Sequence, residues 1–149
     1  MKAVAIALAC LAGCTAPDVG DLLPGTAVND AGDTVDVSCD NSDSNPALDV
    51  SFSRDIRPLM LRSPGGCFPC HLSRTTSGLD VSSYALFRRG GVNAGASIIV
   101  DFEPCKSVLL KKLSRTPPFG SRMPLAEPYY NDEQQLMFRD WIAEGARNN

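Results

Sequence analysis

Apolar side chains recur at helical spacing in short stretches after about residue 50, and they predict four short helices. The first covers residues near 54–62, with Asp55 as its N-cap and Pro58 in its first turn, where a missing N–H costs little. The second covers about 81–89, with Asp80 as its N-cap and two glycines at its end. The chain between these helices is rich in Gly, Pro and Ser, which is typical of turns.

A third helix is expected to begin at Pro104 and to turn Leu109, Leu110 and Leu113 toward the core. Just before it, residues 97–102 are apolar enough for a strand. A lone strand would have no partner, so we expect an extended apolar loop there. No sheet is predicted anywhere in the chain.

The last helix has the strongest local signal. Asn131 is an N-cap residue, Gln134 completes a capping-box pattern, and Gly145 follows the apolar repeat as a stop signal. Before it, residues 115–130 contain four prolines and cannot form regular helix. The predicted fold class is therefore all-α, with about four short helices and long loops.

Residues 1–13 resemble a bacterial lipoprotein signal peptide. Lys2 precedes a short apolar stretch, and Leu-Ala-Gly stands directly before Cys14. The resemblance implies cleavage before Cys14 and lipidation of that residue, which would anchor the protein to a bacterial membrane. An ordinary secretory signal is the alternative. Either signal predicts an exported protein that faces the periplasm or the cell exterior.

Residues 14–49 have the composition of a tether. They carry eight aspartates and no Lys or Arg, with few large apolar side chains. Such a segment buries too little surface to offset the entropy lost on ordering, so we expect it to be flexible. A calcium loop is the alternative, but the Asp-x-Asp-x-Asp-Gly order and the terminal Glu are missing. The folded domain is predicted to cover 50–149.

Charge differs between these two parts of the chain. The formal net charge of the whole chain is −3, yet residues 50–149 hold thirteen Lys and Arg against nine Asp and Glu. A mildly basic domain would attract an acidic redox partner, although scattered solvated side chains give the same count. We expect a monomer with no nucleic-acid partner.

The candidate chemistry lies in Cys67-Phe68-Pro69-Cys70-His71, which has the Cys-x-x-Cys-His pattern of covalent haem attachment. Thiols three positions apart lie on one side of a helical turn, where both can bond to one porphyrin. The adjacent His71 can then ligate the iron. Because His71 is the only histidine in the chain, a bis-histidine ligand pair is excluded. We expect one haem c per chain.

A methionine, a lysine or no side chain remains for the sixth iron position. Met60 and Met137 lie at apolar helix positions, so we expect both in the core. Met123 lies in the proline-rich loop, from which a thioether can reach the iron. The alternative role for Met123 is to fill a gap in the packing.

From about residue 52 to 146 the chain resembles a single-haem bacterial cytochrome c domain of the small, all-helical class I type. Besides the haem motif, the resemblance rests on Phe52-x-x-Asp55-Ile56-x-Pro58, Gly78-Leu79-Asp80, Ser107-Val108-Leu109-Leu110, Met123-Pro124 and Trp141-Ile142-x-x-Gly145-Ala146. It implies covalent haem c on Cys67 and Cys70, iron ligation by His71 and Met123, and electron transfer between redox proteins in place of enzyme catalysis. Leu125 departs from the family, in which a second proline often follows Met-Pro.

Two cysteines of the mature chain, Cys39 and Cys105, remain, and in an oxidising compartment they can form a disulfide or stay as free thiols. Two other functions compete with the cytochrome. A zinc or redox-thiol module would use Cys67, Cys70 and His71, with Cys39 or Cys105 as a fourth zinc ligand. An open-iron haem sensor or peroxidase would leave the sixth position vacant.

Overall fold

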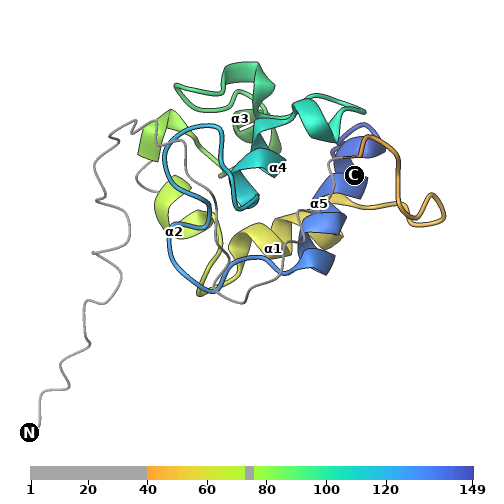
Figure 1. Cartoon of the computed structure of the whole chain (residues 1–149), viewed down its shortest axis with the longest axis horizontal. Helices are drawn as coiled ribbons and strands as arrows, with labels where there is room; N and C mark the ends of the chain where they lie inside the picture. The colour runs from red at the N-terminus through yellow and green to blue at the C-terminus, as the bar shows by residue number, and fades with distance from the viewer. Residues whose placement is uncertain (1–39, 73–75) are drawn as a thin grey trace, which may run out of the picture.

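The structure is a computed structural model that describes residues 40–72 and 76–149. Within these ranges every regular element is helical, which confirms the all-α fold class (Figure 1). No helix of this part of the chain is long and apolar enough to span a membrane. The predicted signal peptide, Cys14 and Cys39 lie outside the described residues.

The described elements are short helices of three kinds. In chain order they are the π-helix η1 (Phe52–Ile56), α1 (Arg57–Leu61), α2 (Phe68–His71), the 3₁₀ helix η2 (Thr76–Gly78), α3 (Tyr84–Phe87), the 3₁₀ helices η3 (Gly95–Ile98) and η4 (Pro104–Lys106), α4 (Val108–Leu113) and α5 (Asp132–Ala143).

The first predicted helix is present, but its start differs from the prediction. Ser51 is the N-cap, and its Oγ accepts a hydrogen bond from the Arg54 N–H at 3.2 Å. The predicted N-cap, Asp55, is therefore wrong. Its carboxylate instead accepts from the Ser51 N–H at 2.8 Å, so Asp55 satisfies the backbone donor of the residue that caps the helix. Pro58 lies in the first turn of α1, as expected.

The predicted helix over 81–89 is shorter in the structure, where α3 covers only Tyr84–Phe87. Its N-cap is Ser83, whose Oγ accepts from the Leu86 N–H at 3.3 Å. The predicted cap, Asp80, is wrong because its carboxylate accepts from the Ser82 N–H at 2.8 Å and so closes a local turn of its own.

The predicted third helix is divided into two elements. Pro104 begins the 3₁₀ helix η4, and α4 starts separately at Val108 with Ser107 as its N-cap. The three leucines of α4 are buried, as predicted. Before η4, the expected extended loop is helical at its start, since Ser97 and Ile98 belong to η3.

Helix α5 confirms the capping prediction. Asn131 Oδ1 accepts from the Gln134 N–H at 2.9 Å, and Gln134 Oε1 accepts from the Asn131 N–H at 3.1 Å. The prediction that Met137 is a core residue is wrong, because 37% of it is exposed. Phe138, Trp141 and Ile142 are fully buried, so the buried face of α5 leaves out Met137 alone among the large apolar residues from 137 to 142.

The core lies where η1 and α4 pack against α5. The Phe52 and Trp141 rings lie 5.6 Å apart between centroids, and Tyr84 contacts Phe52 edge-on at 5.2 Å. Met60 is 1% exposed and belongs to this core, as predicted. Ring pairs of this kind add about 0.5–1.5 kcal/mol beyond the area they bury.

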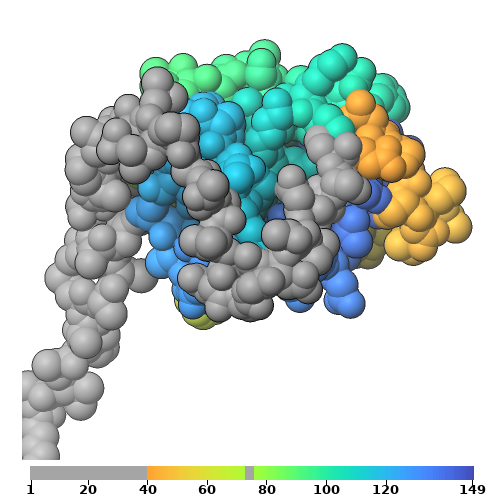
Figure 2. Space-filling view, in the orientation of Figure 1, coloured from red at the N-terminus to blue at the C-terminus, as the bar shows by residue number. Residues whose placement is uncertain are grey.

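Residues 40–49, the described end of the predicted tether, lie against the domain (Figure 2, orange). Ser44 Oγ donates to the buried carboxylate of Asp140 at 2.6 Å. Asn41 donates to Glu103 at 2.7 Å and accepts from the Cys105 N–H at 3.0 Å. These contacts hold the segment on α5 and η4.

Candidate functional site

A cavity of about 390 Å³ lies between α2, α4 and the Met123 loop, by which we mean residues 114–131. Cys67, Cys70 and His71 line it from α2 and its N-cap, and Met123 lines it from the loop. The structure thus brings together the two cysteines predicted to attach the haem and the two residues, His71 and Met123, predicted to ligate its iron. We call this space the α2/α4 cavity.

The walls of the α2/α4 cavity are mainly apolar. They include Val81, Phe87, Ile98, Leu109 and Leu113, of which all but Leu109 are less than 5% exposed over the residue as a whole. Pockets that hold organic cofactors are usually apolar, with few polar groups, and measure about 300–1,000 Å³. The cavity therefore fits a mostly apolar organic cofactor in size and in lining.

A tight turn between α1 and α2 places the two cysteines at the cavity. The Cys67 N–H donates to Met60 O at 2.8 Å, which folds the chain back onto α1. Gly66 makes this possible, because a Cβ there would lie 2.3 Å from Arg62 O and 2.6 Å from Met60 O. The next residues form the single turn α2, in which the His71 N–H donates to Cys67 O at 3.0 Å.

His71 has the protonation state that a metal ligand needs. Its Nδ1 lies 3.1 Å from Thr76 O, and a carbonyl oxygen can only accept, so Nδ1 carries the proton and Nε2 keeps its lone pair. Burial lowers the pKa of His71, which is 8% exposed, and so favours the neutral imidazole. The contact with Thr76 O thus holds the His71 ring in one tautomer.

Cys67 is a free thiol in contact with Tyr130. The Tyr130 hydroxyl donates to Leu59 O at 2.9 Å, so its oxygen can accept from Cys67 Sγ, which lies 3.7 Å away. Burial raises the pKa of Cys67 to about 11, and the thiol is therefore protonated at neutral pH.

Cys70 and Cys105 are both disulfide-bonded, and Cys39 lies outside the described residues. The predicted pair of Cys39 and Cys105 is therefore not tested at Cys39, although Asn41, two positions further on, contacts the Cys105 N–H. At Cys70 a disulfide and a thioether to haem are alternative states of one sulfur atom. Haem attachment requires the Cys70 thiol.

The Met123 loop is fixed to α4 by hydrogen bonds. The Met123 N–H donates to Lys112 O at 2.7 Å, and Arg122 Nε donates to Leu113 O at 3.0 Å. Both acceptors lie in the last turn of α4, where carbonyls have no partner within the helix. Met123 itself is half-buried and packs against the core.

Three residues at the site escape sequence analysis. Lys112 lines the cavity beside Met123, Tyr130 contacts Cys67, and Arg62 lies over the Tyr130 ring at 4.0 Å while donating to Pro128 O at 2.6 Å. Nothing in the sequence separates Lys112 from its neighbour Lys111, or Tyr130 from Tyr129. Their roles depend on segments distant in the chain.

Comparisons with protein-family models, with curated proteins and with solved structures found no match. The resemblance to cytochrome c domains therefore stays a sequence-based prediction. Among the described residues no three His, Cys, Asp or Glu side chains gather into a group that could hold a metal ion. The zinc alternative is untested where it uses Cys39.

Proposed function

We propose that this chain is an exported electron-transfer protein that carries one covalently attached haem c. One observation carries the proposal. The haem-motif residues Cys67, Cys70 and His71 line the same apolar cavity as Met123, which comes from a different part of the chain. A thioether, an imidazole and two thiols at one apolar cavity form the donor set of a His/Met cytochrome c.

In this proposal Cys67 and Cys70 hold the haem covalently, and His71 and Met123 ligate its iron. When bound, the haem supplies a one-electron couple. Thr76 O orients the His71 ring through Nδ1 and increases the basicity of Nε2. The buried walls of the cavity keep water away, so that little solvent has to reorganise when the charge changes.

The proposed partners follow from charge and from the N-terminal sequence. The excess of Lys and Arg in 50–149 suits an acidic redox protein. Lipidation of Cys14 would keep the domain at a membrane surface, where it would exchange electrons with such partners.

The disulfide at Cys70 is the one observation that favours the redox-thiol alternative. A thiol-exchange site needs a thiolate that attacks readily, and its cysteine usually has a lowered pKa. Burial gives Cys67 a raised pKa instead. The cavity residues therefore support the haem protein better than the thiol module.

The test is the visible spectrum of the oxidised and reduced protein, made in a host that matures c-type haem, with a haem stain on the denatured gel. We expect stain that survives denaturation and sharp low-spin bands on reduction. The double variant Cys67→Ser, Cys70→Ser is the control and should lose the stain. A colourless parent from a competent host would rule the proposal out, and zinc analysis of that sample would test the main alternative.

A further inference from the structure

Lys112 is joined to the Met123 loop by its side chain and by its backbone. Its Nζ donates to Phe119 O at 2.6 Å and to Ser121 O at 2.5 Å. The same ammonium lies 4.8 Å from the centroid of the Phe119 ring. Its carbonyl oxygen accepts from the Met123 N–H at 2.7 Å. One residue of α4 thus contacts three residues of the loop within five positions.

These contacts matter because the Met123 loop contains no regular helix between the end of α4 and the start of α5. Its shape therefore depends on hydrogen bonds to other elements. An ammonium has three donors and makes charge-assisted hydrogen bonds, which are stronger than hydrogen bonds between neutral groups. Leu109 and Leu113 of the same helix are buried in the core. They hold α4 in place, and with it the Lys112 backbone that the loop contacts.

We propose that Lys112 is a positioning residue that holds Met123 at the α2/α4 cavity, so that the thioether can stay on the haem iron. This inference rests on the proposed function. Two carbonyls before Met123 are fixed to the Lys112 side chain, and the Met123 backbone is fixed to the Lys112 carbonyl. Removal of the ammonium releases the Phe119 and Ser121 carbonyls but leaves the bond from the Met123 N–H to Lys112 O. The loop is then less firmly held, so Met123 leaves the iron more often.

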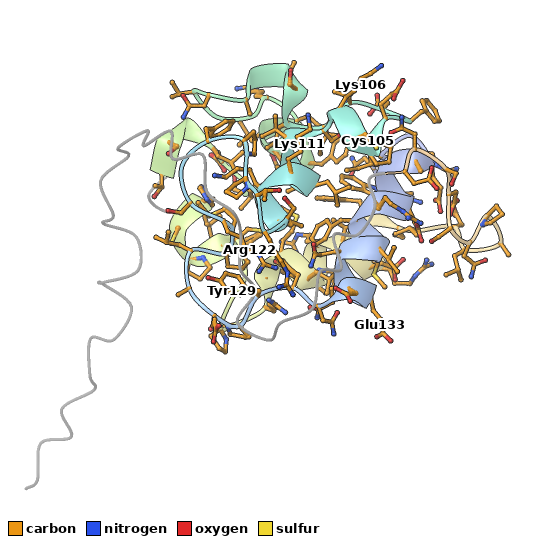
Figure 3. The ribbon with its side chains drawn as sticks, in the orientation of Figure 1. Cys105, Lys106, Lys111, Arg122, Tyr129 and Glu133 are labelled. Atoms are coloured by element: carbon orange, nitrogen blue, oxygen red, sulfur yellow. The ribbon has the colours of Figure 1, made fainter. Side chains whose placement is uncertain are left out.

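A neighbouring lysine provides a matched control. Lys111 precedes Lys112 on α4 and is exposed (Figure 3). Lys111→Leu removes the same charge from the same helix and leaves the contacts to the loop in place. Lys112→Arg keeps the charge and offers donors to the same carbonyls, so it tests for rescue.

The experiment is an optical titration of the oxidised haem protein with imidazole, which binds to the iron only when Met123 is released. We expect Lys112→Leu to bind imidazole roughly tenfold more tightly than the parent, which is the size expected for one lost charge-assisted hydrogen bond. Lys111→Leu should match the parent, and Lys112→Arg should recover most of the difference. Hydrogen exchange at the Met123 amide should rise in Lys112→Leu alone.

An imidazole affinity of Lys112→Leu equal to that of the parent overturns the inference, and so does an equal rise in Lys111→Leu. If Lys112→Leu does not mature, Lys112→Gln replaces it, because an amide keeps a donor but loses the charge. It should bind imidazole with an intermediate affinity, and parent-like affinity would overturn the inference. The haem stain separates the two proposals, since a parent without stain contradicts the proposed function itself.

Discussion

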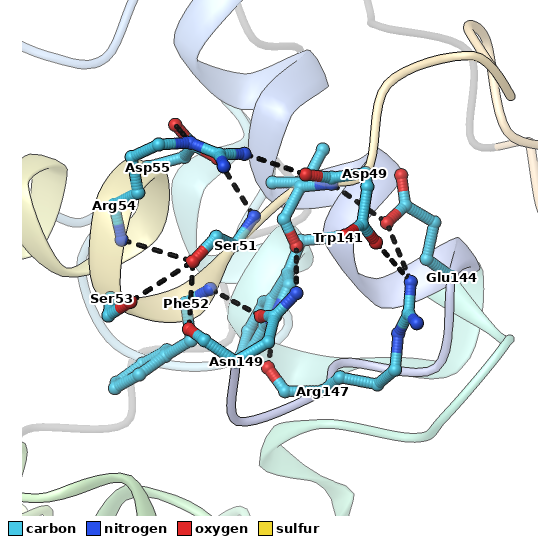
Figure 4. A network of polar contacts seen from close by, with 11 residues as sticks. Asp49, Ser51, Phe52, Ser53, Arg54, Asp55, Trp141, Glu144, Arg147 and Asn149 are labelled. Carbon is cyan, nitrogen blue, oxygen red and sulfur yellow. Dashed lines mark hydrogen bonds and ion pairs between the residues drawn. The ribbon is translucent and has the colours of Figure 1, made fainter.

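The backbone N–H of Phe52 donates to the side-chain oxygen of Asn149 at 2.8 Å. Three further contacts surround this bond (Figure 4). The side-chain amide of Asn149 donates to Val50 O. The main-chain oxygen of Asn149 accepts from the Ser53 N–H and from the Ser51 hydroxyl. Asn149, which lies six positions after the end of α5, thereby satisfies donors at the start of η1, where a helix has no internal partners for them.

The first prediction concerns this link. Asn149→Ala removes the bonds to Phe52 and Val50 and leaves a part-buried N–H without its acceptor. We expect a loss of about 1–2 kcal/mol in the free energy of unfolding, measured by urea denaturation. Asn148→Ala is the control, because Asn148 is exposed. Equal effects of the two variants would mean that the contact does not stabilise the domain.

The second prediction concerns pH. Hydrogen bonds from Arg54 lower the pKa of Asp55 below its ordinary value of 3.8, and the Ser51 N–H adds to this effect. A carboxyl with a lowered folded-state pKa stabilises the fold above that ordinary value, and this contribution is lost as the pH falls through the folded pKa. Asp55→Asn should therefore lower the free energy of unfolding by about 1 kcal/mol at neutral pH, the size of one net hydrogen bond.

In strong acid, well below pH 3.8, the difference between Asp55→Asn and the parent should shrink. Urea midpoints at the two pH values measure it. Glu127→Gln, at an exposed carboxyl in the Met123 loop, should show no such change. A pH-independent difference for Asp55→Asn would show that the charge of Asp55 does not stabilise the start of η1.

The third prediction concerns the turn before the haem motif. Gly66→Ala would place a Cβ within 2.6 Å of two carbonyl oxygens, so the turn must open. We expect a loss of about 1–3 kcal/mol in stability. Less covalent haem should also be found per chain, since Cys67 moves with the turn. Gly95→Ala is the contrast, because a Cβ there meets nothing within 4 Å and only its φ of 51° opposes it.

The fourth prediction concerns the sixth iron position. Met123→Ala should yield a reduced haem protein that binds carbon monoxide at neutral pH, whereas the parent should not. Met137→Ala is the control, since Met137 is exposed on α5. Free binding of carbon monoxide by the parent would contradict ligation by Met123 and support the open-iron alternative. The measurement is the spectrum of the reduced protein under the gas.

The sequence alone determined the elements whose signals are local. The capping box of α5 joins Asn131 and Gln134, three positions apart, and forms whenever that helix does. The prolines of 115–130 exclude helix wherever the loop lies. The haem motif is local in the same way, because its spacing places two thiols and an imidazole on one turn.

Where two local signals compete, the tertiary structure decided between them. Ser51 and Asp55 are both cap residues, and the structure uses Ser51, next to Asn149 and the core. Ser83 likewise prevails over Asp80. Helix periodicity does not fix which side of α5 faces inward, and packing against Phe52 and Tyr130 turned Phe138 and Trp141 inward and left Met137 exposed.

Only the tertiary structure brought Met123 to the cavity of His71, and it did so through Lys112, for which the sequence has no distinguishing signal. Residues that form hydrogen bonds between distant segments are not separated by a fixed number of positions. Such bonds therefore cannot be predicted from sequence spacing, as caps and turns can. The sequence predicted which groups would hold the proposed haem. The packing of α4 and the loop decided that they line one cavity.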